Sequence, residues 1–484
     1  MLGYFHQKHT LKRGQEIFLG LFLLFCFHLT ACGGGIDKDL SNSFNVEEGE
    51  ELSGGQTTVF VTSDKAFRLP AANLSFDEDG DFKIGNSFFE KDWVTAPATT
   101  TARDGLGPTF NARSCSGCHV RDGRGILPES PLESPVGLLF RLSIPGQDPE
   151  TNGPLAHPDY GSQLQTNAIL GVPIEGSVQI TYEEISGQYG DGSPYTLIKP
   201  NYEFVDLSFG DLSESLFSPR LAPPMPGMGL LEAIAEEDVL TLHDPEDRDG
   251  DGISGKANYV WDSESQGLSL GRFGWKAEQA SVRNQVAGAF LGDIGITSPV
   301  NPQNNCPDSQ IECQSSPHGG EPEIEEDLFE KVVFYSSTVG VPARRSWDSQ
   351  QVLAGKALFH EMGCTQCHRP SFSTRQDYPL APLAGQKIRP YTDLLLHDMG
   401  EALSDHRPSF EAQGSEWRTP PLWGIGLNEV VTGLGKARFL HDGRARDLSE
   451  AILWHGGEGE SAKENFRLAS QEERTQLLEF LNSL

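Results

Sequence analysis

The chain has 484 residues and carries 69 acidic against 37 basic side chains, which gives a formal net charge of −32. A surface this acidic repels nucleic-acid phosphates and anionic lipid headgroups, which excludes DNA- and RNA-binding classes. A chain of this length exceeds what one hydrophobic core organises, so two or more domains are expected.

The first 31 residues have the features of a secretory signal. Basic residues precede an apolar run over 17–29, which is too short to span a bilayer comfortably. The run ends in Leu-Thr-Ala-Cys32-Gly, which resembles a bacterial lipobox and makes Cys32 the predicted lipidation site, with an ordinary cleaved signal as the alternative. Residues 32–58, rich in Gly, Ser, Asp and Glu, predict a flexible tether.

These features predict a periplasm-facing protein that contacts the membrane through a lipid anchor only. Gly33 rather than Asp follows Cys32, so we expect sorting to the outer membrane.

Two segments, 115–119 and 364–368, share the pattern Cys-x-x-Cys-His. This pattern is the attachment signature of a c-type haem, in which two thiols bind the porphyrin and the histidine binds iron. A zinc half-site or a thioredoxin-like pair is the alternative, but neither requires a histidine directly after the second cysteine, twice. We expect two covalently bound haem c groups on these residues: Cys115, Cys118, His119, Cys364, Cys367 and His368.

Residues 126–260 are rich in Gly and Pro and alternate apolar and polar residues over 177–182 and 194–205. This pattern predicts loops and hairpins inserted into the first haem domain. Helical spacing recurs in five segments: 229–240, 281–291, 349–361, 447–455 and 470–483.

We therefore expect a mainly α fold with two cytochrome c-like domains. The N-terminal haem domain is predicted over 59–340 with its insertion at about 126–260, and the C-terminal one over 341–484.

Asp247, Asp249 and Asp251 alternate along a Gly-containing segment, as in an EF-hand loop, although Asn258 stands where the closing Glu is usual. A calcium site is predicted here, with a solvated Asp/Gly-rich turn as the alternative.

Cys306 and Cys313 lie in a polar segment. A short disulfide is expected in an oxidising compartment, with two free thiols as the alternative.

A weak internal repeat relates the two halves. An Arg-Phe pair begins at Arg272 in the first half and at Arg438 in the second, 166 positions later. The same offset separates Val282 from Leu448. Each half is therefore predicted to contain a haem motif, an Arg-Phe loop and an amphipathic helix.

These segments resemble the bacterial di-haem cytochrome c peroxidase superfamily. The chain looks closest to the di-haem oxidoreductase branch, whose members are also described as peroxidases or thiol oxidoreductases. The resemblance covers roughly residues 75–484 and lies in these stretches: Asp104–Pro108, Phe110–Ala112, Cys118-His119, Asp122–Gly125, Gly271–Gln285, Arg418–Trp423 and Phe439–His455.

The resemblance implies that one six-coordinate haem collects electrons while the other leaves its distal face open to peroxide. It places the distal ligand of the electron-transfer haem at His455, where relatives carry Met or Tyr. That iron would be bis-His, with a lower potential than a His/Met pair. Met399 is the alternative ligand.

Subtracting 166 from His455 leads to Ala289, which cannot bind iron. The haem on His119 therefore lacks the ligand of its counterpart and is the predicted reactive site. Three side chains of the inserted region could still cap it: His157, Met225 and Met228.

The resemblance also implies catalytic residues, because peroxide cleavage needs a distal group that moves a proton between the two oxygens. Gln285 matches the family's Gln, whereas the family's carboxylate position falls on Gly295 and Asp293 is the nearest acid. Trp275 matches an aromatic residue between the haems. Four arginines are expected to pair with haem propionates: Arg124, Arg272, Arg438 and Arg444.

The expected function is oxidoreduction, with electrons passing from the His368 haem to the His119 haem and on to peroxide. A small cytochrome or another periplasmic donor would supply them. The alternatives are a non-enzymatic electron-transfer cytochrome and a di-haem oxidase acting on a protein or thiol.

Overall fold

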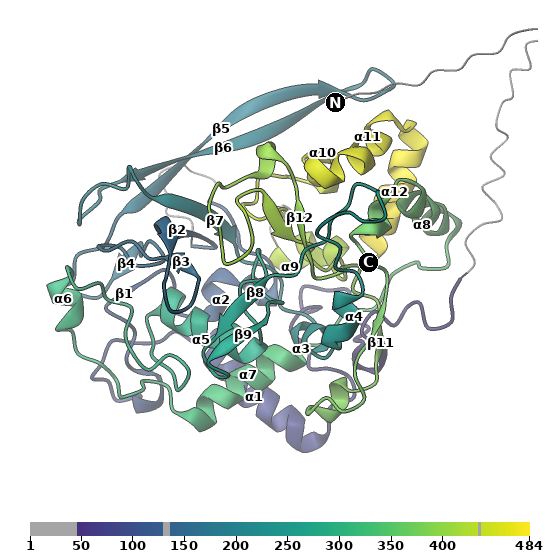
Figure 1. Cartoon of the computed structure of the whole chain (residues 1–484). Helices are drawn as coiled ribbons and strands as arrows, with labels where there is room; N and C mark the ends of the chain where they lie inside the picture. Colours follow the sequence, from purple (N-terminus) through teal and green to yellow (C-terminus); the bar gives the residue numbers. More distant parts are fainter. Residues whose placement is uncertain (1–45, 129–135, 434–436) are drawn as a thin grey trace, which may run out of the picture. The chain divides into compact units, whose positions relative to one another are not determined.

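The computed structural model describes residues 46–128, 136–433 and 437–484 (Figure 1). The predicted signal peptide, Cys32 and the first part of the predicted tether lie outside the described residues. The end of that tether is not free, because the side chain of Glu50 is 1% exposed and forms ion pairs with Arg344 and Lys356. A flexible segment therefore does not extend to residue 58.

The longest helices form two packed pairs, α1 with α7 and α8 with α12. Serine side chains accept a backbone N–H at the start of α1, α8 and α12, which satisfies one of the donors left open at a helix N-terminus. Their bounds are α1 Phe76–Glu90, α7 Glu326–Thr338, α8 Gln350–Glu361 and α12 Gln471–Ser483.

The other helices are short: α2 Cys115–Cys118, α3 Met228–Glu232, α4 Glu236–Leu240, α5 Val282–Ala289, α6 Ile311–Gln314, α9 Asn428–Thr432, α10 Leu448–Leu453 and α11 Glu460–Leu468. Within the described residues, no helix combines the length and the apolar character needed to span a bilayer.

Strands form small antiparallel sheets in the described part of the chain. Their bounds are β1 Thr109–Phe110, β2 Leu138–Gln147, β3 Pro154–Leu155, β4 Asn167–Ala168, β5 Ser177–Gln188, β6 Pro194–Val205, β7 Leu216–Leu221, β8 Tyr259–Asp262, β9 Gly267–Leu270, β10 Phe372–Ser373, β11 Lys387–Ile388, β12 Leu396–Asp398 and β13 Glu416–Arg418.

The expectation of a mainly α fold is wrong. The described chain is 30% helical and 19% strand, with the strands spread over many small sheets. The reason lies largely in the inserted region, where β2 pairs with the distant β7 and β5 pairs with β6 along its whole length. Side chains alternate between buried and partly buried at the start of β2 and of β5, whereas β5 beyond Ile180 is largely exposed.

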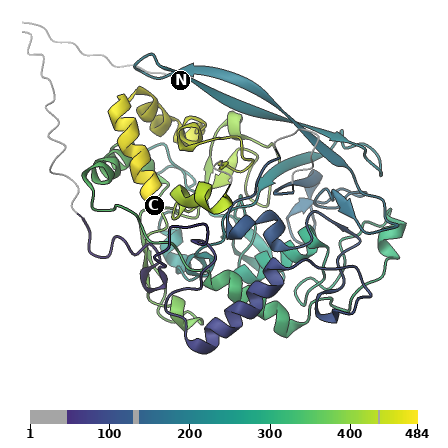
Figure 2. The same ribbon diagram turned by 180° about the vertical axis from the view of Figure 1, so that it is seen from behind.

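The β5–β6 hairpin extends from the inserted region across to the C-terminal helices α10, α11 and α12 (Figures 1 and 2). At its tip, the N–H of Gly190 donates to the carbonyl of Arg467 (2.8 Å), and the ring centroid of Tyr189 lies 6.3 Å from that of Phe466. Leu197 on β6 belongs to the same apolar cluster as α8, α10 and α12. The hairpin thus ties the insertion to the last third of the chain.

Two large apolar clusters make up most of the core. One gathers α5, α7 and neighbouring loops, and it also takes side chains from beyond residue 341, including Phe372, Leu395 and Trp423. The other gathers α8, α10, α11 and α12. Because the first cluster crosses residue 341, the division into two haem domains at that position stays a prediction.

Candidate functional site

The first Cys-x-x-Cys-His motif lines a cavity between α1, α5 and α7. Cys115 and Cys118 begin and end α2, remain free thiols, and are followed by His119. The His119 Nδ1–H donates to the carbonyl of Pro223 (2.7 Å), and burial lowers the pKa of the imidazole. A neutral imidazole fixed through Nδ1 presents Nε2 as a metal ligand.

The second motif repeats this chemistry in a second cavity. Cys364 and Cys367 are again free thiols, and the His368 Nδ1–H donates to the carbonyl of Tyr391 (3.0 Å). Burial lowers the pKa of His368 to about 4, so the imidazole is neutral and its Nε2 is available.

His455 lines the same cavity as His368, close enough to lower the pKa of His368 electrostatically. Its Nδ1–H donates to the carbonyl of Ala451 (2.7 Å), one turn earlier in α10, and burial lowers its own pKa. His455 is thus oriented in the same way as the two motif histidines, with Nε2 free to bind iron.

Met399 also lines the second cavity, as a neighbour of His455. A Cβ placed on Gly459 would lie 3.2 Å from His455 Cδ2 and 3.2 Å from Met399 Cε. Gly459 therefore provides the space in which the two side chains meet. Both candidate ligands reach one region of the cavity, and only His455 has an orienting hydrogen bond.

The first cavity places Gln285, Ala289 and Asp293 together with His119. α5 ends at Ala289 and continues as one π-helical turn over Phe290–Ile294, which carries Asp293. Such turns shift the phase of the following side chains and occur often at functional sites. The π turn carries Asp293 into the cavity, although the family resemblance places the carboxylate two positions later, at Gly295.

The Asp293 carboxyl is held by a residue that the sequence did not single out. Gln163 Nε2 donates to Asp293 Oδ1 (2.9 Å), to the carbonyl of Gly292 (2.8 Å) and to Asn111 Oδ1 (2.6 Å). Gln163 is 2% exposed and comes from the inserted region. Burial raises the pKa of Asp293, although the nearby positive charge of Arg141 opposes this.

The three side chains considered as caps for the first iron are separated by the fold. Met225 and Met228 line the first cavity, on the loop whose Pro223 carbonyl binds the His119 ring. Met225 packs in an apolar cluster with aromatic rings of α1 and α7. His157 is not among the residues that line either cavity, and its ring lies against Tyr160 (5.2 Å).

Four residues line both cavities and form the wall between them: Arg124, Trp275, Arg418 and Pro420. The Trp275 indole is fixed because its Nε1–H donates to the carbonyl of Leu221 (2.8 Å). The guanidinium of Arg124 lies 5.6 Å from the centre of that indole. Trp275 therefore lies between the two cavities, and its role in electron transfer stays a prediction.

The wall arginines are buried without enough negative charge beside them. Burial lowers the pKa of Arg124 and that of Arg418 to about 10, and Arg124 Nε has no hydrogen-bond partner in the described structure. Of the four arginines predicted to bind propionates, Arg124 is the one that lines the described cavities. Arg444 is instead paired with Asp442, and Arg418 was not predicted.

A second cluster of buried charges adjoins the first cavity. Arg220, Arg407 and Lys276 face two carboxylates, Glu278 and Asp405. Burial lowers the pKa of Lys276 to about 8, and Arg220 Nη2 and Arg407 Nε have no hydrogen-bond partner in the described chain, although Arg220 Nη2 lies 4.0 Å from Asp405 Oδ2. The three cations outnumber the two carboxylates, and because uncompensated buried charge is costly, the surplus positive charge suits anionic groups such as the propionates of two haems. The donor set and the charges of both cavities fit haem.

The 166-residue repeat is present in the backbone. An antiparallel bridge joins Phe273 to Gln279 in the first unit, and the equivalent bridge joins Phe439 to Ala445 in the second. α5 and α10 then begin at equivalent positions, each after a residue whose side chain accepts a backbone N–H of the first helical turn. The two cavities are therefore built from the same loop-and-helix unit.

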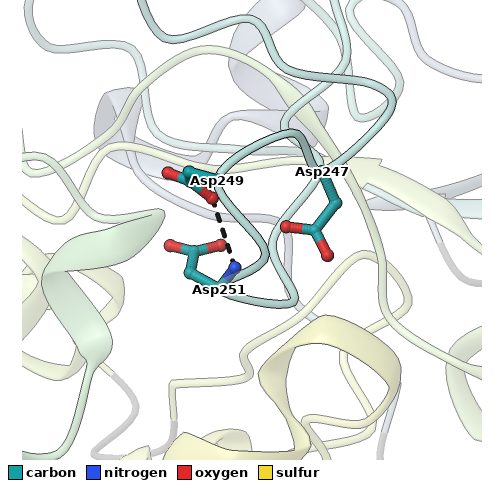
Figure 3. A group of neighbouring side chains, drawn as sticks. All are labelled: Asp247, Asp249 and Asp251. Carbon is teal, nitrogen blue, oxygen red and sulfur yellow. Dashed lines mark hydrogen bonds between the residues drawn. The ribbon is translucent and has the colours of Figure 1, made fainter.

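A zinc site finds no support at either motif. In the described chain, the one group of three potential ligand side chains that converge is Asp247, Asp249 and Asp251 (Figure 3). The N–H of Asp251 donates to Asp249 Oδ1 (3.2 Å), and Gln366 Nε2 of the second motif donates to Asp251 Oδ2 (3.0 Å). These carboxylates lie near one another at the edge of the second cavity, and calcium binding there stays a prediction.

Cys306 and Cys313 are joined by a disulfide. The loop between them contributes Gln310, whose Nε2 donates to the buried Glu175 Oε1 (2.7 Å). The other oxygen of Glu175 accepts the N–H of Gln165 (2.6 Å), whose side chain donates to the carbonyl of Gly292 beside Asp293. Glu175 and Gln165 support the first cavity and, like Gln163, have no local sequence signature.

Two thiol-and-histidine cavities that share a tryptophan-and-arginine wall define a di-haem redox protein. Residues 48–484 match the family described as "Di-haem oxidoreductase, putative peroxidase", and the chain belongs to this family.

A solved structure of hydrazine synthase from Kuenenia stuttgartiensis, pressurized with 20 bar xenon, aligns with a TM-score of 0.32 and 12% identity. The alignment covers 86% of this chain and 94% of that chain. The search of curated proteins found no match.

Proposed function

We propose that the protein reduces peroxide with electrons that enter through the second cavity and leave through the first. The observation that carries this proposal is the difference between the groups facing the two motifs. His455 lines the same cavity as His368, whereas Gln285, Ala289 and Asp293 line the first cavity with His119. A second imidazole would close the second site, and the first would combine an open position with an acid and an amide.

Each haem would be held covalently by the two thiols of its motif and by the Nε2 of the adjacent histidine. The propionates would meet the buried guanidinium groups of Arg124 and Arg418 at the wall. When bound, the haem at His119 supplies the metal that accepts peroxide and transfers electrons to it.

Asp293 would act as the proton carrier of the first cavity. Burial favours its neutral form, and Gln163 occupies Oδ1, so a proton held at Oδ2 is available to the cavity. The Gln285 side chain has no hydrogen-bond partner among the described residues, so its amide is available to orient a bound peroxide. A positioned acid of this kind moves the proton needed as the O–O bond breaks.

Trp275 would mediate electron transfer from the second cavity to the first. Its indole lines both cavities and is fixed by the hydrogen bond to Leu221. His455 supports this direction, because a second imidazole would close the donor-side iron to peroxide and leave it to carry electrons.

The proposal includes a periplasmic location, with Cys32 as a lipid anchor in the outer membrane and no other membrane contact. The net charge of −32 suits a positively charged electron donor such as a small basic cytochrome. It also includes a structural calcium ion at Asp247, Asp249 and Asp251.

The test is the spectrum and the peroxide reaction of the matured protein. We expect two haems per chain, with a high-spin component at one of them when the protein is air-oxidised. Gln285→Ala should slow peroxide consumption by about 10²-fold, within the range for loss of one positioned catalytic group, without loss of haem. The matched control is Gln351→Ala, because Gln351 is exposed on α8 and lines neither cavity.

Two outcomes would contradict the proposal. Fewer than two haems per chain would remove the covalent attachment at one motif. Two low-spin haems that do not react with peroxide would identify an electron carrier instead of a peroxidase.

A further inference from the structure

A chain of aromatic rings leads from His119 into the α1–α7 helix pair. The ring centroid of Phe89 lies 6.2 Å from that of His119 and 5.1 Å from that of Tyr335. Tyr335 on α7 is completely buried. One phenylalanine therefore connects the iron-binding histidine to a phenol that water does not reach.

The phenol has a proton acceptor built beside it. The Tyr335 O–H donates to Asp122 Oδ1 at 2.6 Å, and Asp122 is 1% exposed. Arg68 Nε lies 3.6 Å from the other oxygen, Oδ2. A phenol that loses an electron becomes a very strong acid, so it is oxidised readily only where its proton has somewhere to go.

The second motif has the same ring contacts with a phenylalanine in the place of the phenol. The centroid of Phe359 lies 6.2 Å from that of His368 and 5.1 Å from that of Phe480 on α12. A Cβ on Gly355 of α8 would lie 2.7 Å from Phe480 Cβ, as one on Gly85 of α1 would lie 2.6 Å from Tyr335 Cβ, so Tyr335 and Phe480 hold equivalent places in the two helix pairs. The phenol and its carboxylate are therefore specific to the cavity that we propose to meet peroxide, which argues against a purely structural ring pair repeated at each haem.

We propose that Tyr335, with Asp122, is a redox-active site that supplies an electron to the His119 cavity when the second haem has none to give. This inference rests on the proposed function, because the oxidant is a peroxide bound in that cavity.

The electrons and protons of this step balance. Reduction of one peroxide to two waters takes two electrons and two protons. One electron comes from the haem at His119 and the other from Tyr335 through Phe89. The Tyr335 O–H bond breaks, its proton moves to Asp122 Oδ1, and a neutral tyrosyl radical remains beside a protonated carboxyl. The two protons that form water come from the peroxide-side acid and solvent.

The site would protect the first cavity from a peroxide that arrives without reducing equivalents. A buried radical is shielded from solvent and from other chains, so it persists until the donor returns an electron. Without Tyr335, the second oxidising equivalent would be taken up by other side chains near the haem.

The test uses the fully oxidised, haem-loaded protein and one equivalent of hydrogen peroxide. Rapid freezing followed by electron paramagnetic resonance should show a radical that changes line shape when the protein contains ring-deuterated tyrosine. Tyr335→Phe keeps the ring packing and should lose this signal. Asp122→Asn keeps the phenol but removes the acceptor, and should lower the radical yield by at least several-fold.

The matched control is Tyr378→Phe. Tyr378 also donates to a carboxylate, Glu232 Oε1 at 2.9 Å, but it has no ring contact with either motif histidine in the described structure. The radical should persist in this variant.

A tyrosyl signal of equal size in Tyr335→Phe would overturn the inference and leave the proposed function standing, provided that peroxide still changes the haem spectrum. If peroxide changes neither the spectrum nor the radical signal of the wild-type protein, the proposed function and this inference both fail.

Discussion

The two cavities use one backbone unit and different side chains at three equivalent positions. Counting 166 residues from the first unit to the second, Gln285 becomes Ala451 and Ala289 becomes His455. All four residues line their respective cavities. In the proposed function, this exchange of single side chains in a duplicated loop and helix distinguishes an iron site closed by His455 from one left open at Ala289.

The third position shows how each exchange is accommodated. Asp293 corresponds to Gly459, and both line their cavities. In the first cavity the π turn and Gln163 support a buried acid. In the second cavity the missing side chain leaves space for His455. The acid depends on distant residues, whereas the histidine is oriented by its own helix.

We expect the largest effect on peroxide turnover from exchanging the side chains at the two equivalent positions, Ala289 and His455. Ala289→His places an imidazole where the second cavity carries His455. We expect the high-spin component to disappear and peroxide turnover to fall by more than the roughly 10⁴-fold that proton transfer alone supplies, because the substrate position is blocked. Visible spectra and peroxide consumption are the measurements.

The reciprocal change and a size control sharpen this comparison. His455→Ala should open the second iron and create a second high-spin component with no loss of haem. Ala289→Leu adds bulk without a ligand atom, so it should retain the high-spin component that Ala289→His loses. If Ala289→His still binds peroxide, the two positions are not equivalent and the comparison fails.

Local sequence patterns predict those parts of each cavity that are formed by residues close together in the chain. The Cys-x-x-Cys-His motifs are contiguous, and the constant offset predicts the helix starts of α5 and α10. The hairpin strands at 177–182 and 194–205 were also recognised from alternation. The fold class was wrong because the mixed character depends on pairing such as that of β2 with β7, which no local pattern reveals.

The polar network of the first cavity shows the same limit. Gln163, Gln165 and Glu175 belong to the insertion, and their partners Asp293 and Gly292 lie far along the chain. Nothing in their local sequence distinguishes them from surface glutamines and glutamates, because their role comes entirely from tertiary contacts.

The next largest effect on peroxide turnover is expected from removing the acid of the first cavity, Asp293. Asp293→Asn should lower peroxide turnover by about 10²–10⁴-fold with both haems retained. Because burial raises the pKa of Asp293, the protonated form persists to higher pH than in a free carboxyl, and wild-type turnover should fall as pH rises through that pKa. The variant should lack this descending limb.

Steady-state peroxide consumption across a pH series provides the measurement. Asp348→Asn is the control, because Asp348 is exposed and lines neither cavity. Full turnover in Asp293→Asn would assign the proton to another group.

A smaller effect concerns the support of the first cavity rather than its chemistry. Burial raises the pKa of Glu175 from 4.5 to about 8, so the folded state binds a proton that the unfolded state releases. This contribution to stability is complete below pH 4.5 and is lost as pH rises toward 8. The shift corresponds to roughly 5 kcal/mol at most.

Glu175→Gln is neutral at every pH and should remove this dependence, so the variant should be the more stable protein above pH 8. If the Gln310 amide turns, its unpartnered Oε1 can accept from the new side chain, and its Nε2 gives up the bond to the carbonyl of Asp159 (2.8 Å). Unfolding midpoints measured between pH 5 and 9 check this. Parallel curves for the two proteins would show that Glu175 is not the group responsible.

The smallest expected effect separates the two candidate ligands of the second iron. Met399 and His455 meet at Gly459, but only the His455 imidazole is fixed by a backbone carbonyl, at 2.7 Å. Met399→Leu nearly conserves volume and should cost less than about 1.5 kcal/mol of stability.

If His455 is the ligand, the low-spin spectrum and the reduction potential of the second haem should stay as they are, because the iron keeps both imidazoles. If Met399 is the ligand, its loss removes the thioether that favours ferrous iron, and the potential falls. A redox titration of wild type and Met399→Leu therefore decides between a bis-histidine electron carrier and a His/Met one, and a lowered potential would remove His455 from the contrast between the two cavities.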